Sequence, residues 1–446
     1  MEKGLPARLV RCGSRVWACA PVRSRVGPVR HGCGGRSCVT ERLPFEGLRV
    51  IDFTHVIAGP LATFQLAMLG ADVMKIEPPG RGDQLRRMGG EPDRAENGLG
   101  TAFLAINSGK RSLALDLKRA EGRDAALRLV AGADVVAENF RPGVMERLGL
   151  GADTLRERNP RAVYCSLSGY GRHPDWAWRP AYDHIVQGVA GAMWTQGEEG
   201  APPVKIGFPM ADTAAGYAAF TAICVALIER NATGRGRHID VSMTAATLAM
   251  MATPVHGFLA TGNLPARIGN TAFSGSPASG TYETADAPVV VTANTEAQFA
   301  GLCAALGLEG LEGAADPIAW RDPAVDLSHV RRMVAACLKR KDAAHWERVL
   351  NEAGVPTGKV RTVPEALAEA CIAERGFVSA IPDPGRPGEE FRLHGTPYAF
   401  DGETPAPAGS APHLGEHSRA LLAEAGLGAD EIDALFAEGI AEEMRT

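Results

Sequence analysis

Apolar and polar positions along residues 48–168 alternate in a way that predicts strands separated by helices. Short runs rich in Val, Ile and Leu end in polar turns, and the stretches between them carry apolar residues at helical spacing. Strands that alternate with helices favour a doubly wound, mostly parallel α/β sheet. The expected strands are 48–53, 71–77, 112–117, 134–138 and 162–168, with helices at 60–69 and 120–131.

The pattern becomes more helical after residue 180. Residues 262–280 are rich in Gly, Ser and Pro and mark a candidate domain boundary. Strand and helix signals beyond it predict a smaller α+β unit, and two short helices close the chain. The expected elements are helices at 182–194 and 213–230, a strand at 238–243, a helix to about 259, a strand at 289–292, and helices at 296–306 and within 327–354.

Composition narrows the class of protein. With 45% apolar and 22% charged residues, the 446-residue chain is long enough for two domains and resembles a globular rather than a disordered protein. A net charge of −5 gives no sign of nucleic acid as a partner. No uninterrupted apolar stretch of bilayer-spanning length is evident, so we expect no membrane partner. Nine cysteines without a C-x-x-C pair argue against a disulfide scaffold and a zinc site.

Residues 1–44 differ from the rest of the chain. They carry eight Arg and one Lys against Glu2 and Glu41. Such a segment is typical of an organellar transit peptide, although Gly and Pro interrupt the amphipathic helix that a transit peptide needs. A disordered extension, or a start codon placed too early, explains it equally simply. We therefore expect a cytoplasmic protein, or one of the mitochondrial matrix if the segment is a transit peptide.

Asp212 directly precedes the long apolar helix predicted at 213–230. Asp is a favoured N-cap residue, so a simple cap is the plain interpretation. The same position offers backbone donors and the positive end of the helix dipole, which would keep a carboxylate ionised near neutral pH. An ionised carboxylate could attack a thioester carbonyl, and nearby N–H groups could hold the oxyanion.

Seven segments in a shared order carry a family resemblance. They are DFTHVIAGP (52–60), LGADVMKIE (69–77), ENFRPG (138–143), SGYG (168–171), FPMAD (208–212), TGRG (233–236) and HLGEH (413–417). In these motifs the chain resembles the class III CoA-transferases, the CaiB/BaiF family, over residues 43–440. The family's nucleophilic aspartate falls on Asp212. The resemblance implies transfer of CoA from an acyl-CoA to a free carboxylic or dicarboxylic acid through a covalent aspartyl intermediate.

The resemblance also implies the fold and the ligand contacts. We expect an extension (1–44), a large Rossmann-like domain (45–262), a linker and small α+β domain (263–365), and a C-terminal segment (366–446) that returns to the large domain. Two chains would interlock as a homodimer. CoA would be a substrate, with no tightly bound cofactor and no metal. The candidate CoA contacts are His55, Val56, Ala58, Leu115, Lys118, Asn139, Phe140, Arg141, Arg147 and Tyr182.

Departures from the family motifs bear on the substrate. Formyl-CoA transferases carry Gln where this chain has Ile57, which argues against oxalate or formate. In α-methylacyl-CoA racemases of the same family a catalytic His stands where this chain has Tyr182, and Tyr is a poor base because its pKa is about 10. Transfer is therefore favoured over racemisation. The overall pattern is closest to the succinate:hydroxymethylglutarate CoA-transferases.

Other functions remain as alternatives. An NAD-dependent oxidoreductase fits a doubly wound sheet, but the first strand is not followed by G-x-G-x-x-G. A serine hydrolase is disfavoured because no G-x-S-x-G elbow occurs. A protein that binds CoA without turnover would differ in never acylating Asp212. Residues 269–280 are interpreted as a mobile lid, as glycine loops in the family are, or as an ordinary linker.

Overall fold

The computed structural model describes residues 11–12, 15–16, 43–311, 314–321 and 326–444. The predicted extension at 1–44 therefore lies almost entirely outside the described residues. Residues Met1–Arg42 form one unit, in which β1 (Arg11–Cys12) pairs antiparallel with β2 (Arg15–Val16). Residues Leu43–Thr446 form the other unit, which carries all the predicted site residues.

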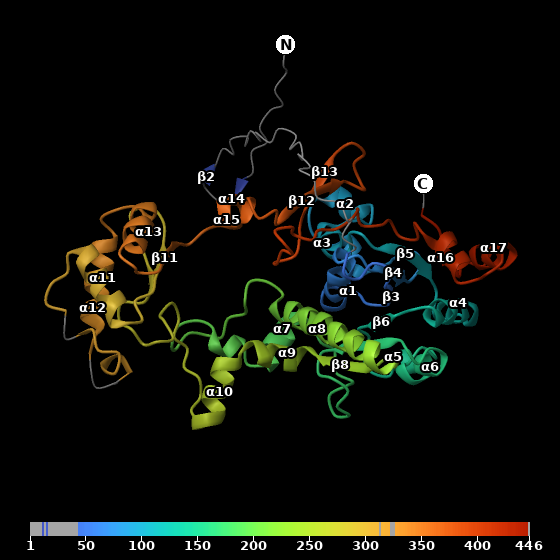
Figure 1. Cartoon of the computed structure of the whole chain (residues 1–446), viewed down its shortest axis with the longest axis horizontal. Helices are drawn as coiled ribbons and strands as arrows, with labels where there is room; N and C mark the ends of the chain where they lie inside the picture. Colours follow the sequence, from blue (N-terminus) through green and yellow to red (C-terminus); the bar gives the residue numbers. More distant parts are fainter. Residues whose placement is uncertain (1–10, 13–14, 17–42, 312–313, 322–325, 445–446) are drawn as a thin grey trace, which may run out of the picture. The chain divides into compact units, whose positions relative to one another are not determined.

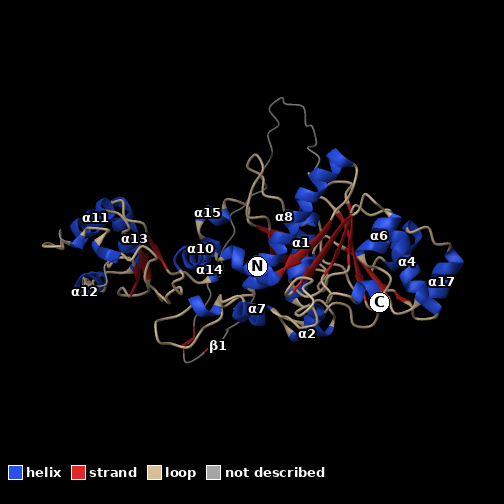
Figure 2. Ribbon diagram, turned by 90° about the horizontal axis from the view of Figure 1, so that it is seen from below, coloured by secondary structure: helices blue, strands red, loops and turns tan. Residues whose placement is uncertain are grey.

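The larger unit is built around a seven-stranded sheet in the order β14-β5-β4-β3-β6-β7-β8 (Figures 1 and 2). All neighbours are parallel except β14, which runs antiparallel to β5 at the sheet edge. The predicted α/β class is thereby confirmed. The strands are β3 (Arg49–Asp52), β4 (Asp72–Glu77), β5 (Arg111–Leu115), β6 (Val135–Glu138), β7 (Val163–Ser168), β8 (His238–Ser242) and β14 (Ala441–Glu442).

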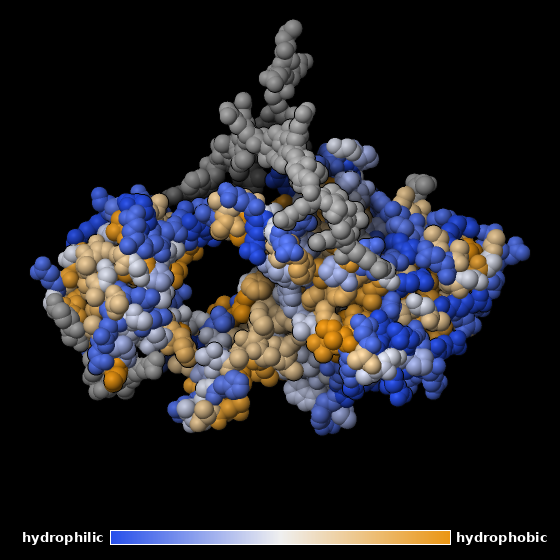
Figure 3. All heavy atoms as spheres, in the orientation of Figure 1, coloured by the Kyte–Doolittle hydropathy of each residue, from blue (hydrophilic) through white to orange (hydrophobic). Residues whose placement is uncertain are grey.

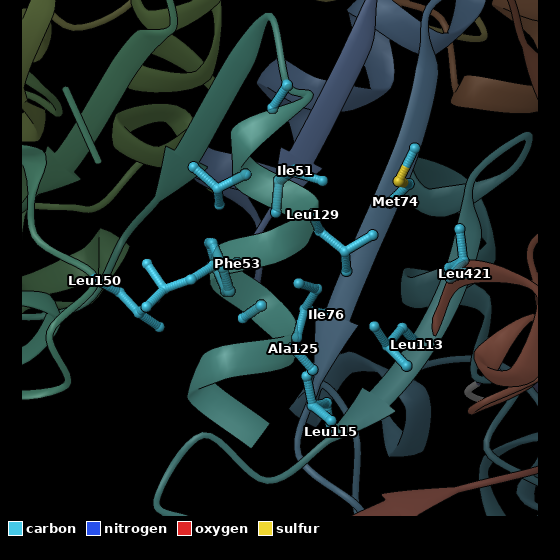
Figure 4. Close-up of a cluster of buried hydrophobic side chains, with 14 of the residues drawn as sticks. Ile51, Phe53, Met74, Ile76, Leu113, Leu115, Ala125, Leu129, Leu150 and Leu421 are labelled. Atoms are coloured by element: carbon cyan, nitrogen blue, oxygen red, sulfur yellow. The ribbon is translucent and has the colours of Figure 1, made fainter. Parts of the chain in front are cut away.

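Helices cover both faces of this sheet because alternate strand residues are apolar on both sides (Figure 2). On one face α1 (Ala58–Met68) and α8 (Met210–Thr233) pack on a layer that includes Val50, Val73 and Val135. On the other face Ile51, Met74 and Leu113 meet Leu129 and Leu421 (Figure 4). The helices on that second face are α4 (Ala120–Ala131), α6 (Ala152–Arg158), α16 (Ser418–Glu424) and α17 (Ala429–Ala437).

A separate hydrophobic core lies within residues 278–355, where Phe299, Trp320 and Trp346 are buried. Its sheet has the antiparallel order β11-β10-β9, from β11 (Thr357–Lys359), β10 (Val289–Val291) and β9 (Gly280–Tyr282). The associated helices are α11 (Glu296–Leu306), α12 (Ser328–Leu338) and α13 (Ala343–Glu352). This is the smaller α+β part that the fold prediction included. Ser276 and Ser279 hydrogen-bond to Ala293, which ties the glycine-rich stretch to this core.

The remaining elements are short. They are α2 (Pro92–Glu96), α3 (Thr101–Asn107), α5 (Val144–Arg147), α7 (Asp183–Val189), α9 (Met243–Met250), α10 (Ala252–Thr261), α14 (Val363–Ala368), α15 (Ala370–Ala373), the hairpin β12 (Val378–Pro382) with β13 (Glu390–His394), and 3-10 turns at Gln84–Arg87, Met193–Thr195 and Ala319–Arg321.

Two helix predictions were wrong in detail. The helix expected to reach residue 259 breaks at Met251, and its two halves bend by 82°. Pro254 lies in the first turn of α10, where its missing N–H breaks no helical bond of α10 but would interrupt a continuous helix. The helix expected at 182–194 ends at Val189 and resumes only as a 3-10 turn.

Helix α8 is long and apolar enough to cross a membrane by length and composition, with a mean hydropathy of 1.6 over its most apolar window. The bent pair α9 and α10 passes the same test when the two are taken together. Asp212, Glu229 and Arg230 interrupt the apolar run of α8, so this finding does not contradict the expectation that no uninterrupted apolar stretch reaches bilayer-spanning length. Helix α8 packs on α1 and β7, and 44% of its most apolar window is buried, so packing accounts for part of its apolar composition.

The buried Arg86–Glu77 pair provides a test of this packing. Both Arg86 Nε and Nη2 donate to Glu77, at 2.8 and 2.6 Å, and the guanidinium also lies 3.8 Å from the Phe103 ring centroid. Arg86→Ala would leave a buried carboxylate unpaired, so we expect the free energy of unfolding to fall by about 3–5 kcal/mol. Urea denaturation measures this free energy of unfolding. Arg348→Ala, which breaks an exposed pair with Glu352, should change it by less than about 0.5 kcal/mol; equal losses in the two variants would contradict the expectation.

Candidate functional site

The strand order reverses beside β3. From β3 the chain adds β4 and then β5 on one side, and afterwards β6, β7 and β8 on the other. The loops that follow β3 and β6 therefore leave the sheet in opposite directions and open a crevice between the strand ends. Residues 53–57 and 139–143 form these two loops, and they hold half of the predicted CoA contacts.

His55 and Asn139 join the two loops. The His55 N–H donates to Asn139 Oδ1 at 2.8 Å, and Asn139 Nδ2 donates to the His55 carbonyl at 2.7 Å. The His55 ring also meets Phe140 edge-on, with 4.4 Å between the ring centroids. Burial, followed by repulsion from the Lys75 ammonium, lowers the pKa of His55 and favours its neutral form. The reciprocal amide pair thus fixes the spacing of the crevice walls.

Val56 adopts a left-handed backbone conformation with φ of 65°, which is strained for a β-branched residue. Its N–H is directed at the buried carboxylate of Asp83, at 3.1 and 3.2 Å from the two oxygens. Asp83 in turn pairs with buried Lys75 at 3.1 Å, and Lys75 donates to the Thr54 carbonyl at 2.7 Å. A buried ion pair therefore holds the first loop in a conformation that the chain alone would not favour.

Helices α1 and α8 approach closely at the crevice. A Cβ at Gly216 would lie 2.8 Å from the Ala58 carbonyl oxygen, so only glycine fits at this crossing. Gly216 stands one turn beyond Asp212 on α8. The contact consequently brings the first turn of α8 beside the start of α1, where Ala58 is the first helical residue.

Asp212 lies in the first turn of α8 and is not its N-cap. The helix begins at Met210 with Pro209 as the cap, which corrects the predicted start at residue 213. Asp212 is 9% exposed. Burial, and then repulsion from Asp183, raise its pKa to about 7. The prediction that helix donors keep this carboxylate readily ionised was therefore wrong.

The first-turn donors of α8 are already bonded. The Ala211 and Asp212 N–H groups donate to Asp183 Oδ1 at 2.7 and 3.2 Å. The Met210 and Thr213 N–H groups donate to the carbonyls of Phe208 and Pro209. These N–H groups are thus not available to hold an oxyanion, so the role expected for them from the sequence was wrong.

A cavity of about 250 Å³ opens between these elements. Of the predicted site residues, eight line it: His55, Val56, Ala58, Asn139, Phe140, Arg141, Tyr182 and Asp212. Ile57, the position that separates this chain from the formyl-CoA transferases, also lines the cavity. The structure therefore gathers most of the candidate residues around one hollow that contains the candidate nucleophile.

Three predicted contacts lie outside this lining. Leu115 is buried in the core on the opposite face of the sheet, so its side chain cannot reach a ligand in the cavity. Lys118 is exposed, with its N–H bonded to Asp116. Arg147 is exposed at the end of α5, and its guanidinium lies 3.2 Å from the position of a Cβ on Gly143.

Several buried or half-buried polar residues around the cavity were missed from sequence. Asp83 bonds to Val56, Asp183 bonds to the start of α8, and Glu138 Oε2 accepts the Phe140 N–H at 2.9 Å. Burial raises the pKa of Glu138 to about 7. Arg179 also lines the cavity, with its guanidinium 3.8 Å from the Trp176 ring centroid. Glu138 could have been found because it opens the ENFRPG segment, whereas Asp83, Asp183 and Arg179 stand in no recognised motif.

The family model for CoA-transferase family III matches residues 45–418. The chain belongs to CoA-transferase family III. It is 38% identical over 384 residues to the acetyl-CoA:oxalate CoA-transferase of Acetobacter aceti, covering 85% of this chain and 95% of the relative. It is 30% identical over 444 residues to the succinyl-CoA:glutarate CoA-transferase of Mus musculus, covering 97% and 100%.

Solved structures agree with this family III assignment. A CaiB/BaiF family protein from Brucella suis matches with a TM-score of 0.75 and 32% identity, covering 86% of this chain and 100% of that protein. The predicted family and enzyme class are confirmed, and the oxidoreductase and hydrolase alternatives are set aside. Within the described residues no group of three or more His, Cys, Asp or Glu side chains could hold a metal ion.

The raised pKa of Asp212 has a consequence for stability that can be measured. Because the folded protein disfavours the ionised form of Asp212, ionisation of this group lowers the free energy of unfolding. This loss is complete above pH 7, shrinks as the pH falls, and vanishes below about pH 4. Asp212→Asn should therefore raise the free energy of unfolding at pH 8 by up to about 4 kcal/mol, with little effect at pH 4. Urea denaturation at both pH values tests this. Asp175→Asn, at an exposed carboxylate, is the control, and a gain for Asp212→Asn that did not depend on pH would contradict the explanation.

Proposed function

We propose that this family III enzyme transfers CoA from an acyl-CoA to a free carboxylic acid, with Asp212 as the nucleophile. The supporting observation is the position of Asp212: this residue, whose carboxyl group is the proposed nucleophile, lines the cavity at the strand-order reversal together with residues of the loops after β3 and β6. At neutral pH about half of these carboxyl groups would be ionised, because the pKa is about 7. The ionised half is poorly solvated and is therefore a reactive carboxylate.

The proposed reaction begins with attack of an Asp212 oxygen on the thioester carbonyl. A C–O bond forms, the C–S bond breaks, and the electron pair leaves with sulfur as the CoA thiolate. The acceptor carboxylate then attacks the aspartyl carbonyl of the mixed anhydride and expels the donor acid. Finally the thiolate attacks the acceptor carbonyl, which forms the new thioester and returns Asp212 as a carboxylate.

The charges around the cavity suit a CoA ligand. Arg141 and Arg179 line it, and exposed Arg147 lies near its rim, folded back toward Gly143. The diphosphate and 3'-phosphate of CoA would pair with such guanidinium groups. Lys118 lies outside the cavity lining and would serve only a part of CoA that extends beyond it. The Phe140 ring, held edge-on by His55, offers an apolar contact for the ligand between these charges.

For the acceptor we favour a dicarboxylic acid. The curated relatives are named for oxalate, glutarate and mesaconate. At position 57 this chain presents an apolar Ile to the cavity, which offers no hydrogen bond to a very small acid such as oxalate. A longer acid such as glutarate would carry its second carboxylate away from that side chain. The racemase alternative would need a base at position 182, where this chain has Tyr.

We further propose that two copies associate through the helices around the site. Apolar side chains are exposed along α7 to α10, and Figure 3 shows such residues gathered over α8. Val225 and Ile228 on α8 are 60% and 71% exposed, and Met250 on α9 is 70% exposed. A contiguous apolar surface of this kind marks a protein interface, and the family resemblance implies a second copy as its occupant.

Asp212→Ala tests the chemistry. We expect CoA transfer from succinyl-CoA to glutarate, mesaconate or oxalate, followed as new thioesters by mass spectrometry, to fall by at least about a thousandfold. CoA binding measured by calorimetry should change by less than about threefold, because the phosphate contacts are kept. Asp175→Ala is the matched control. Transfer at the wild-type rate by Asp212→Ala would exclude this nucleophile, and deuterium uptake at the α-carbon without exchange of CoA would favour racemisation.

Changing Val225 and Ile228 together to Glu tests the association. Burying two carboxylates in an apolar interface is costly, so the double variant should dissociate at concentrations at which the wild type sediments as a dimer. Ile318→Glu, at an apolar residue of the smaller core region that is 80% exposed, should leave the sedimentation unchanged. A monomeric wild type, or a double variant that sediments as the wild type does, would contradict the proposed surface.

A further inference from the structure

Asp183 is the residue that bonds to the start of α8. It lies in the first turn of α7, after the N-cap Tyr182. Its Oδ1 accepts the N–H groups of Ala211 and Asp212, at 2.7 and 3.2 Å. The two segments are 28 and 29 residues apart in sequence, so this contact is set by the fold rather than by local chain geometry.

Gln187 holds Asp183 in this orientation. Its Nε2 donates to Asp183 Oδ2 at 2.6 Å, and its Oε1 accepts the Ile206 N–H at 2.9 Å. Gln187 is fully buried, and its Nε2 also lies 3.3 Å from the Phe208 carbonyl. Both oxygens of Asp183 are thereby engaged, and one turn of α7 anchors the whole FPMAD segment that carries the nucleophile.

This arrangement reverses what a helix N-terminus usually does. Unpaired N–H groups and the helix dipole ordinarily stabilise a carboxylate in the first turn. Here Asp183 takes two of those donors and places a second carboxylate beside Asp212. Like charges that face each other in a partly buried site disfavour ionisation of one of them.

We propose that Asp183 is a positioning residue that fixes the backbone at Ala211 and Asp212 and withholds the α8 donors from the nucleophile, so that Asp212 stays a basic and reactive carboxylate. Acylation converts Asp212 to a neutral anhydride and moves its charge to the departing thiolate. That step relieves the repulsion between the two carboxylates, so the same contact favours formation of the covalent intermediate.

Other titratable groups line the same cavity as Asp212. They are His55 from the loop after β3, Arg141 from the loop after β6, and Tyr170, Arg179 and Tyr182 from the segment before α7. A nearby cation would favour an ionised carboxylate, but burial and then Asp183 set the pKa of Asp212, which is raised to about 7.

The test is the pH dependence of kcat/KM for CoA transfer in Asp183→Asn. An Asn oxygen can still accept the two N–H groups, while the charge is gone. In the wild type activity should fall as the pH drops through about 7; in Asp183→Asn this fall should move to lower pH by about one unit or more. Asp175→Asn, an exposed carboxylate on the segment that leads into α7, should keep the wild-type profile.

A second variant is needed because the side-chain amide introduced by Asp183→Asn could fit poorly beside Gln187. Asp183→Ala removes the charge and frees the α8 donors for Asp212, so its profile should move the same way. Unchanged profiles in folded variants would overturn the proposal, and so would loss of activity at every pH with CoA binding retained, which would make Asp183 part of the chemistry. The inference rests on the proposed function, but the two can fail separately. CoA transfer by Asp212→Ala would exclude Asp212 as the nucleophile, whereas an unchanged pH profile of kcat/KM in the Asp183 variants would exclude only the role of Asp183.

Discussion

The site depends on the point between β3 and β6 at which the strand order reverses. Parallel strands on either side of that point send their loops apart, and the gap between them is the crevice in which α/β proteins bind ligands. In this chain the gap is spanned by the reciprocal bonds between the His55 backbone and the Asn139 amide. The Gly216–Ala58 crossing then brings α8, and with it Asp212, to the same place.

A carboxylate stands behind each wall of the cavity, buried at Asp83 and Glu138 and half-buried at Asp183. Asp83 holds Val56, Glu138 holds Phe140, and Asp183 holds the first turn of α8. Beneath them Lys75 and Lys110 neutralise Asp83 and Asp52 at 3.1 and 3.0 Å. Burial alone would raise the pKa of Asp52, but these two ammonium groups hold it well below its usual range. The backbone of the site is therefore set by charges that lie outside the cavity lining.

Much of this could be predicted from the sequence, and the limits have physical causes. The alternation of apolar runs located the strands, and the seven motifs located Asp212 and the two loops. The start of α8 was misplaced because Met210 and Ala211 continue the apolar pattern without a polar stop signal. The pKa of Asp212 was misjudged because it depends first on burial and then on Asp183, and no local pattern encodes either of them. Leu115 was expected from the family resemblance to contact CoA, yet strand alternation turns its side chain into the core on the opposite face of the sheet.

The antiparallel strand β14 has a consequence for how the chain is made. Residues 441–442, which are synthesised long after β5, cap the edge of the sheet at β5, and Ser418 Oγ links that edge to Glu442. Until they leave the ribosome, β5 presents unpaired backbone groups to its surroundings, which is the kind of edge on which nascent chains misassociate. A truncated translation product would keep every residue of the cavity lining and still lack the strand that shields the sheet beneath it.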